Sequence, residues 1–359
     1  MREPGDERRQ RILAVVRARG EARVSDLAAE LEVSVITVRR DVEELAREGK
    51  LRRGHGVARS LVPVPKAPAV PDAKDGAVAL VVPERHAYLN EVVHGARTVL
   101  EEAGVRVVLH IAPRARGADR PIVERVVADE VAGLMIAPRW RTAADEEAAY
   151  GWLAESGVPT VLMERRPRPG SALHAFDSVC TDHWYGMHLA VEHLTALGHR
   201  RIALAARDDS PTARALRVAF AEIAVAHTEI DDWTVLLSAP DAGADPGTPP
   251  GSLIDLIGER GITGAVLHGD DDALMLVQQL ADAGIRVPAD CSVVAYDDVV
   301  AALGRTPLTA IAPPKAEVGK VAAELLLDRL GKASAGRPRR VELIPELKVR
   351  GSTQPYSIV

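Results

Sequence analysis

Near the N-terminus, a short segment combines side chains that could read the edges of DNA bases. Residues 33–45 predict a helix beginning after Ser34, whose hydroxyl can accept an unpaired backbone N–H of the first turn. The stripe expected to face a core has four members at helical spacing: Val35, Val38, Val42 and Leu45. Arg40 points away from this stripe, beside Ile36 and Thr37. In a major groove, arginine can bond guanine and a methyl-bearing side chain can touch thymine.

Taken alone, this helix could also be a surface helix with an incidental arginine, so its neighbours decide. A helix over 9–19 ends at Gly20, and Ser25 is expected to cap a short second helix before the tight turn 32–34. This order of elements predicts a helix-turn-helix. Two glycines within residues 51–58 predict a β-hairpin wing, where basic side chains could meet phosphate or the minor groove.

The N-terminal 55 or so residues resemble the DeoR-type winged helix. The motifs that carry the resemblance occur in order: VSDLA at 24–28, VS at 33–34, TVRRDV at 37–42, Leu45, Gly49, Leu51, Arg53 and HG at 55–56. The resemblance implies a double-stranded DNA operator as partner. The candidate DNA-binding residues are Ser34, Ile36, Thr37, Arg39, Arg40, Arg52, Arg53 and His55.

A second group of candidates follows the expected strands of the remaining chain. In open α/β sheets, ligands bind beyond the carboxyl ends of the strands. The residues at or near these positions are aromatic, arginine, histidine and carboxylate, and such groups hold polyhydroxylated ligands. The candidates for effector binding are Tyr88, Arg139, Trp140, Arg165, His183, Trp184, Arg217, Asp270 and Asp297. Two alternatives stay open, since Asp297 could merely cap a turn and Trp184 could lie in the core.

The elements that must position these residues alternate regularly between strand and helix. Apolar runs predict strands over 77–82, 107–111, 133–137, 160–163, 177–181, 201–206, 234–238, 264–267 and 292–295. Helical patterns fill the intervals, at 89–103, 119–129, 143–155, 184–197, 212–224, 253–260 and 273–283. Strict alternation with short loops indicates an α/β fold with two parallel, doubly wound sheets.

Several motifs in this region resemble the LacI/GalR sensor domain, which has a periplasmic-binding-protein-like fold. They include AVEHL at 190–194, LGHRRIA at 197–203, GIRVPAD at 284–290, SVVAYDD at 292–298 and PELKVRGST at 345–353. The resemblance implies two lobes joined by three crossovers, with lobe one at about 76–175 and 302–330 and lobe two at about 176–301 and 331–359. It also places Arg217 and Asp297 on the family's effector-binding positions.

Charge and composition divide the chain in the same way. Residues 1–59 contain 14 Lys and Arg against 11 Asp and Glu, whereas the remaining 300 residues contain 31 against 40. A mildly basic head on an acidic body fits a modular DNA-binding protein. A single copy of this weakly basic N-terminal domain should bind DNA weakly, so we expect a homodimer and an inverted-repeat operator. The expected domains are 1–58, a proline-rich linker at 59–75, and 76–359.

Other classes of function find less support in the sequence. Two isolated cysteines, Cys180 and Cys291, indicate packed thiols in a reducing cytoplasm, and neither a membrane span nor a signal peptide is visible. We expect no metal and no cofactor, because the motifs of 270–272 and of His183, His188 and His193 have unsuitable spacing. The sequence therefore predicts a cytoplasmic transcriptional regulator, most simply a repressor with a carbohydrate effector. A sugar-directed enzyme tethered to DNA and a solute-binding protein are the alternatives.

Overall fold

The computed structural model of the chain divides into two compact units, Met1–Pro71 and Asp72–Val359. The structure describes residues 5–19, 21–31, 33–54, 57–60, 76–84, 87–113, 115, 117–140, 143–238, 252–331 and 336–356. Most of the expected linker and the Pro- and Gly-rich loop 241–251 lie outside these ranges. Within them, no helix is long and apolar enough to cross a membrane.

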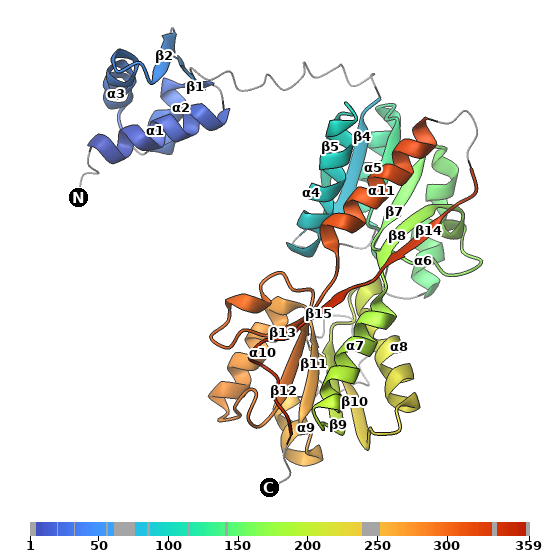
Figure 1. Cartoon of the computed structure of the whole chain (residues 1–359). Coiled ribbons are helices and arrows are strands. Elements are labelled where there is room, and N and C mark those ends of the chain that lie inside the picture. Colours follow the sequence, from blue (N-terminus) through green and yellow to red (C-terminus); the bar gives the residue numbers. More distant parts are fainter. Residues whose placement is uncertain are drawn as a thin grey trace. The chain divides into compact units, whose positions relative to one another are not determined.

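The N-terminal unit is a helix-turn-helix with a β-hairpin beside it (Figure 1). Its elements are α1 (Gly5–Arg19), β1 (Glu21–Arg23), α2 (Val24–Glu30), α3 (Val35–Arg47), β2 (Leu51–Gly54) and β3 (Val57–Ser60). Strands β2 and β3 pair antiparallel, which confirms the wing. Strand β1 pairs with the other edge of β3 and was not predicted, because three residues carry no recognisable period.

The core of this unit contains most of the predicted stripe of α3. Val38, Val42 and Leu45 are buried in one cluster with residues of α1 and α2. Val35 differs from the prediction, because it is the first residue of the helix, at the end of the packed face, and remains 43% exposed. The prediction for Ser25 was also wrong: α2 already begins at Val24, so Ser25 is a helical residue.

The second unit contains two six-stranded sheets. The first has the strand order β14-β8-β7-β6-β4-β5, and all of its neighbouring strands are parallel. Its elements are β4 (Val78–Pro83), α4 (Ala87–Glu102), β5 (Val107–Ala112), α5 (Asp119–Ala128), β6 (Gly133–Ile136), α6 (Ala143–Tyr150), β7 (Thr160–Met163), β8 (Asp177–Thr181), α11 (Lys315–Leu330) and β14 (Arg340–Leu343). Two 3-10 turns, Gly151–Ser156 and Ala172–Ala175, complete this lobe.

The second sheet has the order β10-β9-β11-β12-β13-β15 and is parallel except for its last pair. Its elements are α7 (His183–Ala196), β9 (Arg201–Ala206), α8 (Pro211–Ala226), β10 (Asp232–Leu237), α9 (Leu253–Arg260), β11 (Gly264–His268), α10 (Asp270–Asp282), β12 (Ser292–Tyr296), β13 (Thr309–Ala312) and β15 (Glu346–Lys348), with a 3-10 turn at Ala301–Leu303. Helix α10 begins three residues earlier than expected, so its first turn contains three aspartates.

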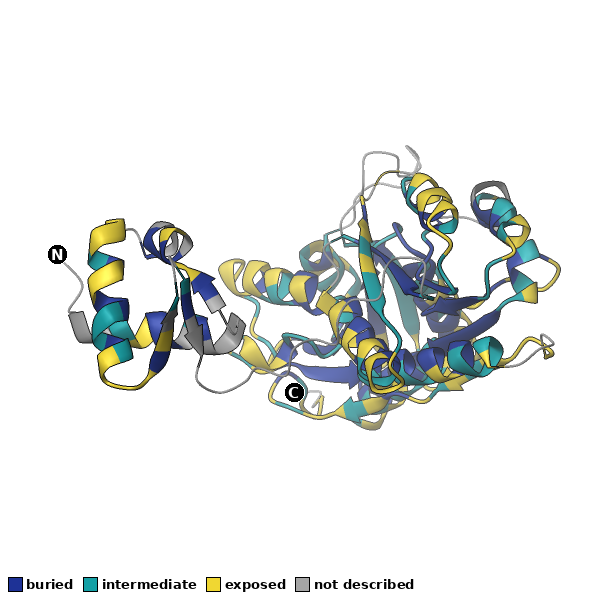
Figure 2. Cartoon of the chain, turned by 90° about the horizontal axis from the view of Figure 1, so that it is seen from above, coloured by how far each residue is buried: buried dark blue, intermediate teal, exposed yellow. Residues whose placement is uncertain are grey.

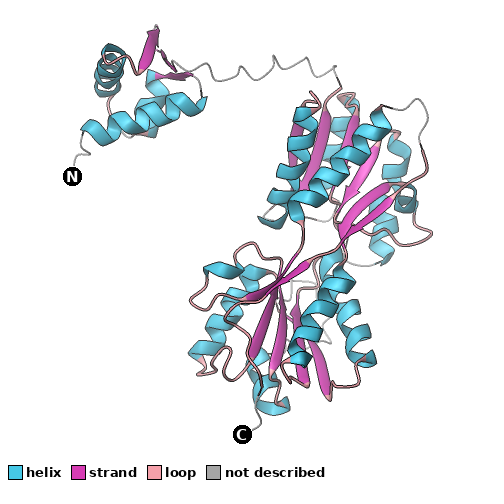
Figure 3. Cartoon of the chain, in the orientation of Figure 1, coloured by secondary structure: helices cyan, strands magenta, loops and turns pink. Residues whose placement is uncertain are grey.

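Helices lie on both faces of each sheet (Figure 3), and the central strands are buried throughout (Figure 2). All residues of β4, β6, β7, β8, β11, β12 and β13 are buried. Covering a parallel sheet on both sides removes the polar face that an open sheet would need. This explains why continuous apolar runs, rather than alternating patterns, identified the strands.

The predicted lobe boundaries were wrong by one strand at each crossing. β8 belongs to the sheet of lobe one, although 176–301 was assigned to lobe two. β13 belongs to the second sheet, and β14 returns to the first before β15 joins the second. The chain thus passes between the lobes three times. Each passage comes one strand later than predicted: after β8, after β13 and after β14. Apolar runs locate a strand without identifying the sheet it joins.

A close helix contact positions two side chains of lobe one at the cleft between the lobes. Gly95 of α4 and Gly319 of α11 have no room for a side chain, because a Cβ would lie 2.0 Å from the Ala316 carbonyl oxygen and 1.9 Å from the Val92 carbonyl oxygen, respectively. The helices therefore pack backbone against backbone, and both N-termini point to the cleft. They carry Tyr88 and Lys315, whose ammonium group lies 5.7 Å from the centre of the tyrosine ring.

Candidate functional site

The exposed face of α3 is the candidate DNA-reading surface. The Ser34 hydroxyl accepts the backbone N–H of Thr37 at 3.1 Å, which confirms the predicted cap. Ile36 is 78% exposed, and Arg39 and Arg40 are exposed as well. An isoleucine this exposed at one end of a short helix costs free energy in water, whereas in a major groove its methyl groups would be covered.

A buried ion pair that the sequence did not reveal holds this helix in place. Asp41 is only 5% exposed, and its carboxylate accepts hydrogen bonds from the Arg8 guanidinium of α1 at 2.6 and 3.3 Å. Arg9 lies 3.9 Å away on the same carboxylate. A charged residue between the apolar positions Val38 and Val42 was the available signal, because such a residue needs a partner when it is buried.

The wing supplies one described basic side chain, Arg52 on β2, which is exposed. The side chain of Arg53 and the whole of His55 lie outside the described residues. The wing strands and α3 nevertheless belong to one small core, because Leu51 and Ala58 are buried in the cluster that contains the α3 stripe. The reading helix and the wing are therefore fixed relative to each other.

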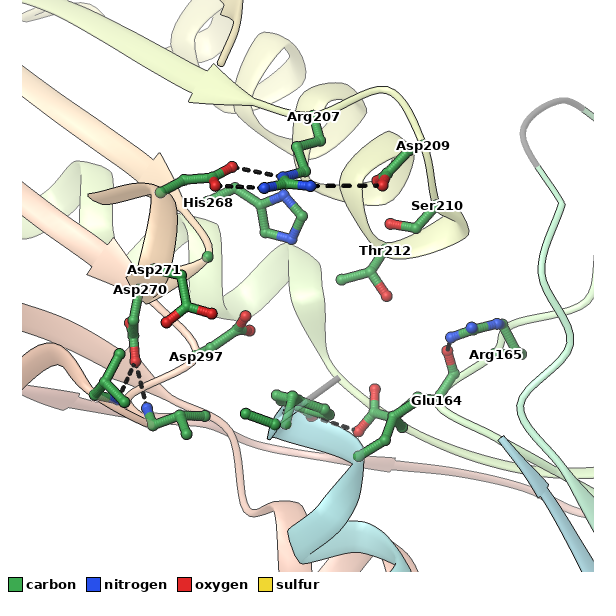
Figure 4. Close-up of a pocket in the computed structure, with 17 residues that line it drawn as sticks. Glu164, Arg165, Arg207, Asp209, Ser210, Thr212, His268, Asp270, Asp271 and Asp297 are labelled. Carbon is green, nitrogen blue, oxygen red and sulfur yellow. Dashed lines mark hydrogen bonds and ion pairs between the residues drawn. The ribbon is translucent and has the colours of Figure 1, made fainter. Parts of the chain in front are cut away.

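The candidate effector site is a cavity in the second unit, at the ends of strands from both lobes (Figure 4). Its volume is about 290 Å³, near the lower limit of the range of about 300–1,000 Å³ usual for small-molecule sites. Four of the nine predicted effector residues line it: Tyr88, Arg165, Asp270 and Asp297. Lining residues that the sequence did not single out include Arg207, Asp209, Thr212 and His268. Each of these four lies at or just beyond the carboxyl end of a strand, or in the first turn of the next helix.

Asp297 lies directly after β12 and lines the cavity. Its backbone has a φ of +113°, a conformation that costs free energy for any residue with a side chain. The Lys315 ammonium donates to the backbone carbonyl of Asp297 at 2.6 Å, not to its carboxylate. Within the described part of the chain, no hydrogen bond reaches that carboxylate. Burial, followed by the nearby Asp270 carboxylate, raises the pKa of Asp297 well above its ordinary value.

Asp270 has a structural role that the sequence did not predict. Its carboxylate accepts the backbone N–H groups of residues 298, 299, 300 and 301, and so organises the loop that follows β12. Burial raises its pKa, although these backbone donors oppose the shift. The side chain therefore shapes the loop that carries Asp297, while one of its edges still faces the cavity.

A charge pair and a neutral histidine form the wall on the side of β9 and β11. Arg207 donates two hydrogen bonds to the Asp272 carboxylate, at 2.5 and 2.6 Å. His268, the last residue of β11, is 9% exposed, and its Nδ1 atom has no partner among the described residues. Burial lowers the pKa of His268 to about 4. The imidazole is therefore neutral at pH 7, and its ring nitrogens accept or donate no hydrogen bond among the described residues.

The floor of the cleft is a polar network centred on Glu164. Its carboxylate accepts the Tyr88 hydroxyl at 2.6 Å and the Thr181 hydroxyl at 3.0 Å, and His183 Nε2 lies at 3.5 Å. Burial alone would raise the pKa of Glu164, but His183, Tyr88 and Thr181 outweigh this effect and hold the pKa below its ordinary value. His183 also contacts the Tyr296 hydroxyl at 3.1 Å, so it connects elements and does not line the cavity.

Two of the predicted arginines make internal bonds. The Arg165 guanidinium donates to the backbone carbonyls of Pro138, Glu164 and Ala137, and burial lowers its pKa to about 10. Arg139 reaches across the cleft from the end of β6.

The partner of Arg139 is Asp209, beyond the end of β9. Nη2 of Arg139 lies 2.8 Å from the Asp209 carboxylate, and Nε donates to the Asp209 carbonyl at 3.0 Å. Because β6 and β9 belong to different lobes, this interaction is an interlobe clasp at the edge of the cavity.

Three predicted residues lie away from the cavity. Trp140 is 2% exposed and packs edge-on against Tyr150 in the core, with 5.8 Å between ring centres. Trp184 is 44% exposed, on the outside of α7, and its Nε1 donates to Glu222 of α8. Arg217 lies five residues beyond the lining residue Thr212 on α8, which turns it about 140° away around the helix. Sequence position after a strand did not specify these directions.

The comparisons with known proteins agree with this architecture. The profile of the DeoR-like helix-turn-helix domain matches residues 8–63, and that of the periplasmic binding protein-like domain matches residues 191–353. An uncharacterised HTH-type transcriptional regulator in the aml 5′ region of Streptomyces limosus is 30% identical over 354 residues, which cover 93% of this chain and 95% of that protein. The chain belongs to the LacI-type family of transcriptional regulators.

Two further relatives place this LacI-type regulator among proteins with named ligands or targets. The arabinose metabolism transcriptional repressor of Geobacillus stearothermophilus is 28% identical over 335 residues, covering 92% of this chain and 90% of that protein. The structure of a LacI family transcriptional regulator from Enterococcus faecium with bound ribose matches with a TM-score of 0.61 and 25% identity, over 78% of this chain and 100% of that chain. The family is one of DNA-binding regulators, which removes the support for a tethered enzyme.

Proposed function

We propose that this LacI-type regulator is a repressor whose operator binding responds to a sugar or sugar derivative in the cleft cavity. The observation that carries the proposal is the cavity itself, which lies where strands of both lobes end and is lined by polar groups of both. A ligand that contacts both lobes binds their closed arrangement better than an open one. It can therefore shift the equilibrium between the two by its differential affinity.

The relatives support a carbohydrate ligand. One is an arabinose metabolism transcriptional repressor, and one was solved with bound ribose. In this chain, the groups available to hydroxyls include the Asp297 carboxylate, the His268 imidazole and the Thr212 hydroxyl. Tyr88 and Asp270 would act at the same cavity, while Arg165 would hold the loops around it. Arg139 would act through the clasp and not as a direct ligand.

On the DNA side, α3 would enter the major groove with Ile36, Thr37 and Arg40 toward the bases. Ser34 would position the helix end, and Arg39, Arg52, Arg53 and His55 would contact the backbone or the minor groove. Since the head is only mildly basic, we propose that a homodimer binds an inverted-repeat operator in the cytoplasm.

One exposed strand edge supports self-association. β5 is the last strand of the first sheet, and its Leu109 and Ile111 are 43% and 59% exposed. Apolar side chains on an unpaired edge strand tend to be covered by another chain.

A ligand screen on the full chain tests the proposal. An operator is first selected from random duplexes, and its affinity is measured by fluorescence anisotropy with each of a set of pentoses and hexoses. A true effector should raise the melting temperature and change operator affinity at least about tenfold. Asp297→Asn should shift the response to a higher ligand concentration while ligand-free operator affinity stays the same. A ligand that stabilises the protein without changing operator affinity would contradict the regulatory role of the cavity.

A further inference from the structure

The charges that line the cleft cavity are strongly unbalanced. Two guanidinium groups face it, those of Arg165 and Arg207. Six carboxylates face the same space: Glu164, Asp209, Asp270, Asp271, Asp272 and Asp297. The imidazole of His268 adds no positive charge at pH 7, because burial lowers its pKa to about 4. A cavity of this composition holds a negative potential, which attracts cations and repels anions.

Neither lining arginine is available to an anionic ligand. Arg165 points its guanidinium at backbone carbonyls, and Arg207 holds the Asp272 carboxylate with two hydrogen bonds. The two cations behind the lining are engaged as well. Arg139 binds Asp209, and Lys315 donates to the backbone carbonyl of Asp297. A phosphate or carboxylate in the cavity would therefore meet carboxylates without gaining a new cationic partner.

The Asp297 carboxylate, in contrast, has no ion pair among the described residues. It accepts no hydrogen bond there, and the Lys315 charge, which lowers its pKa, is outweighed by burial and by the acidic groups of Asp270, Glu164 and Asp271. Figure 4 shows Asp271 and Asp297 directed into the same space below His268. A buried carboxylate among other carboxylates is unfavourable unless a proton or a cation joins it.

His268 gives an independent indication that a ligand group belongs here. Its side chain is more than nine-tenths buried and lines the cavity, yet Nδ1 has no partner in the described part of the chain. A buried polar atom without a partner costs free energy that a ligand can recover. The imidazole lies beside the carboxylates, so one ligand can place a hydroxyl at the ring nitrogen that faces the cavity and a charged group at the carboxylates below it.

We propose that the cavity takes a polyhydroxylated ligand that carries a protonated amine, with the Asp297 carboxylate as the counter-ion of the ammonium group. The proposal rests on the proposed function, because it names the charge of the effector that the same cavity would bind. Phosphorylated and acidic sugars are excluded by the same charges. The amine distinguishes this site from one built for neutral sugars, in which a hydroxyl would stand where the ammonium stands here.

Isothermal titration of the full chain with matched compounds tests the charge preference. Glucose, galactose and mannose are each compared with the 2-amino-2-deoxy sugar, its N-acetylated form and the 6-phosphate. At least one free amine should bind about tenfold or more tightly than its parent sugar and its N-acetyl form. No phosphate should bind more tightly than its parent. If no amine binds at concentrations up to about 50 mM, or if a phosphate binds best, the proposal is wrong.

A variant connects the preference to Asp297. Asp297→Asn keeps the size of the side chain, and asparagine tolerates a positive φ, so the fold should persist. In this variant the preference for the amine over the parent sugar should fall at least about tenfold. The matched control Asp231→Asn removes an exposed carboxylate before the start of β10, at the opposite edge of the sheet, and should retain the preference. An unchanged preference in Asp297→Asn would contradict the assignment.

Failure of this inference can be distinguished from failure of the proposed function. If a neutral sugar binds and changes operator affinity while its amine binds more weakly, the cavity is an effector site but not one for amines. If an amine binds with the expected preference and operator affinity does not change, the charge assignment holds and the regulatory role fails. Operator anisotropy measured with the same compounds separates the two results.

Discussion

The two functional surfaces of the chain differ in how their charged side chains are used. On α3, the exposed arginines Arg39 and Arg40 make no hydrogen bond within the described residues and are ready to meet an external partner. In the cleft, the arginines already bind carboxylates of the protein itself: Arg139 binds Asp209, and Arg207 binds Asp272. The reading helix presents unused positive charge to solvent, whereas the cleft engages its arginines internally and leaves an excess of carboxylates at the cavity.

This difference indicates how each surface would respond to its partner. DNA offers many phosphates, so a surface of free cations can bind it without rearrangement. A small ligand offers few groups, so its contacts across the cleft must be more favourable than the interlobe contacts that it replaces. The cleft therefore suits a switch between two arrangements, and the helix suits a fixed reading device. Substitutions that remove one internal partner test this contrast most directly.

The largest effect is expected at the ion pair between Arg8 and Asp41 inside the N-terminal unit. Asp41→Ala removes the carboxylate that binds Arg8 and leaves a largely buried guanidinium without this partner, which should destabilise the N-terminal unit by about 3–5 kcal/mol. Operator binding should be lost, and hydrogen exchange should become fast in α1 and α3.

Two controls accompany this substitution. Glu44→Ala removes an exposed partner of Arg47 and should change stability by less than about 0.5 kcal/mol. All four tryptophans, Trp140, Trp152, Trp184 and Trp233, lie in the second unit, so their fluorescence should report unaltered unfolding there. Normal operator affinity in Asp41→Ala would show that the ion pair does not hold the reading helix.

The next effect concerns the neutral histidine of the cavity. Burial holds the pKa of His268 at about 4, against 6.5 for an unconstrained imidazole, so the folded state binds fewer protons than the unfolded state between these values. Stability should therefore fall as the pH drops from 6.5 to 4, by up to about 3 kcal/mol from this residue. Denaturant unfolding followed by tryptophan fluorescence measures this loss.

His268→Gln should remove that part of the pH dependence. The control His94→Gln alters an exposed residue of α4 and should keep the full slope. If His268→Gln loses stability on acidification as steeply as the unchanged protein, His268 is not the group that titrates.

The sequence predicted the order of elements and the exposed face of α3 because both depend on local spacing. A buried parallel strand needs a continuous apolar run, and a capped helix needs one face apolar and one polar. The prediction for Ser34 and the exposed positions of Ile36 and Arg40 followed from the same periodicity. Within the predicted stripe of α3, packing against the other helices left only Val35 exposed, at the end of the packed face.

The cleft was predicted only in part, because its residues depend on contacts between distant segments. Tyr88 and Asp297 follow strands and do line the cavity. Trp140 and Trp184 also follow strands, but one turns into the core and the other to the outer surface. Spacing along the chain does not specify the direction of a loop side chain, nor that Arg139 and Asp209, 70 residues apart, would form a pair.

A smaller effect should separate base reading from backbone contact in the head. Arg40→Ala should reduce operator affinity by about 1–3 kcal/mol and relax the preference at one base position. Arg52→Ala should weaken all sequences alike and reduce the slope of affinity against salt by about one. Anisotropy titrations with single-base operator variants at several salt concentrations measure both. Equal, sequence-independent losses would assign Arg40 to the backbone instead.

The smallest effect is expected at the interlobe clasp. Arg139→Ala removes a largely buried ion pair, but Arg207 stays 4.0 Å from the Asp209 carboxylate, so the loss should be only about 1 kcal/mol and the ratio of closed to open lobes should fall about fivefold. Nitroxide labels introduced by Glu102→Cys and Asp282→Cys, at exposed positions of the two lobes, would show a broader and longer distance distribution in the ligand-free protein. Because a ligand that bridges the lobes must then close them itself, its affinity should fall as well, by no more than that factor. Arg217→Ala is the informative comparison. Its side chain does not line the cavity or join the lobes, so the label distances should stay unchanged even if ligand binding weakens. Unchanged distances in Arg139→Ala would mean that the polar network at Glu164, rather than the clasp, holds the lobes together.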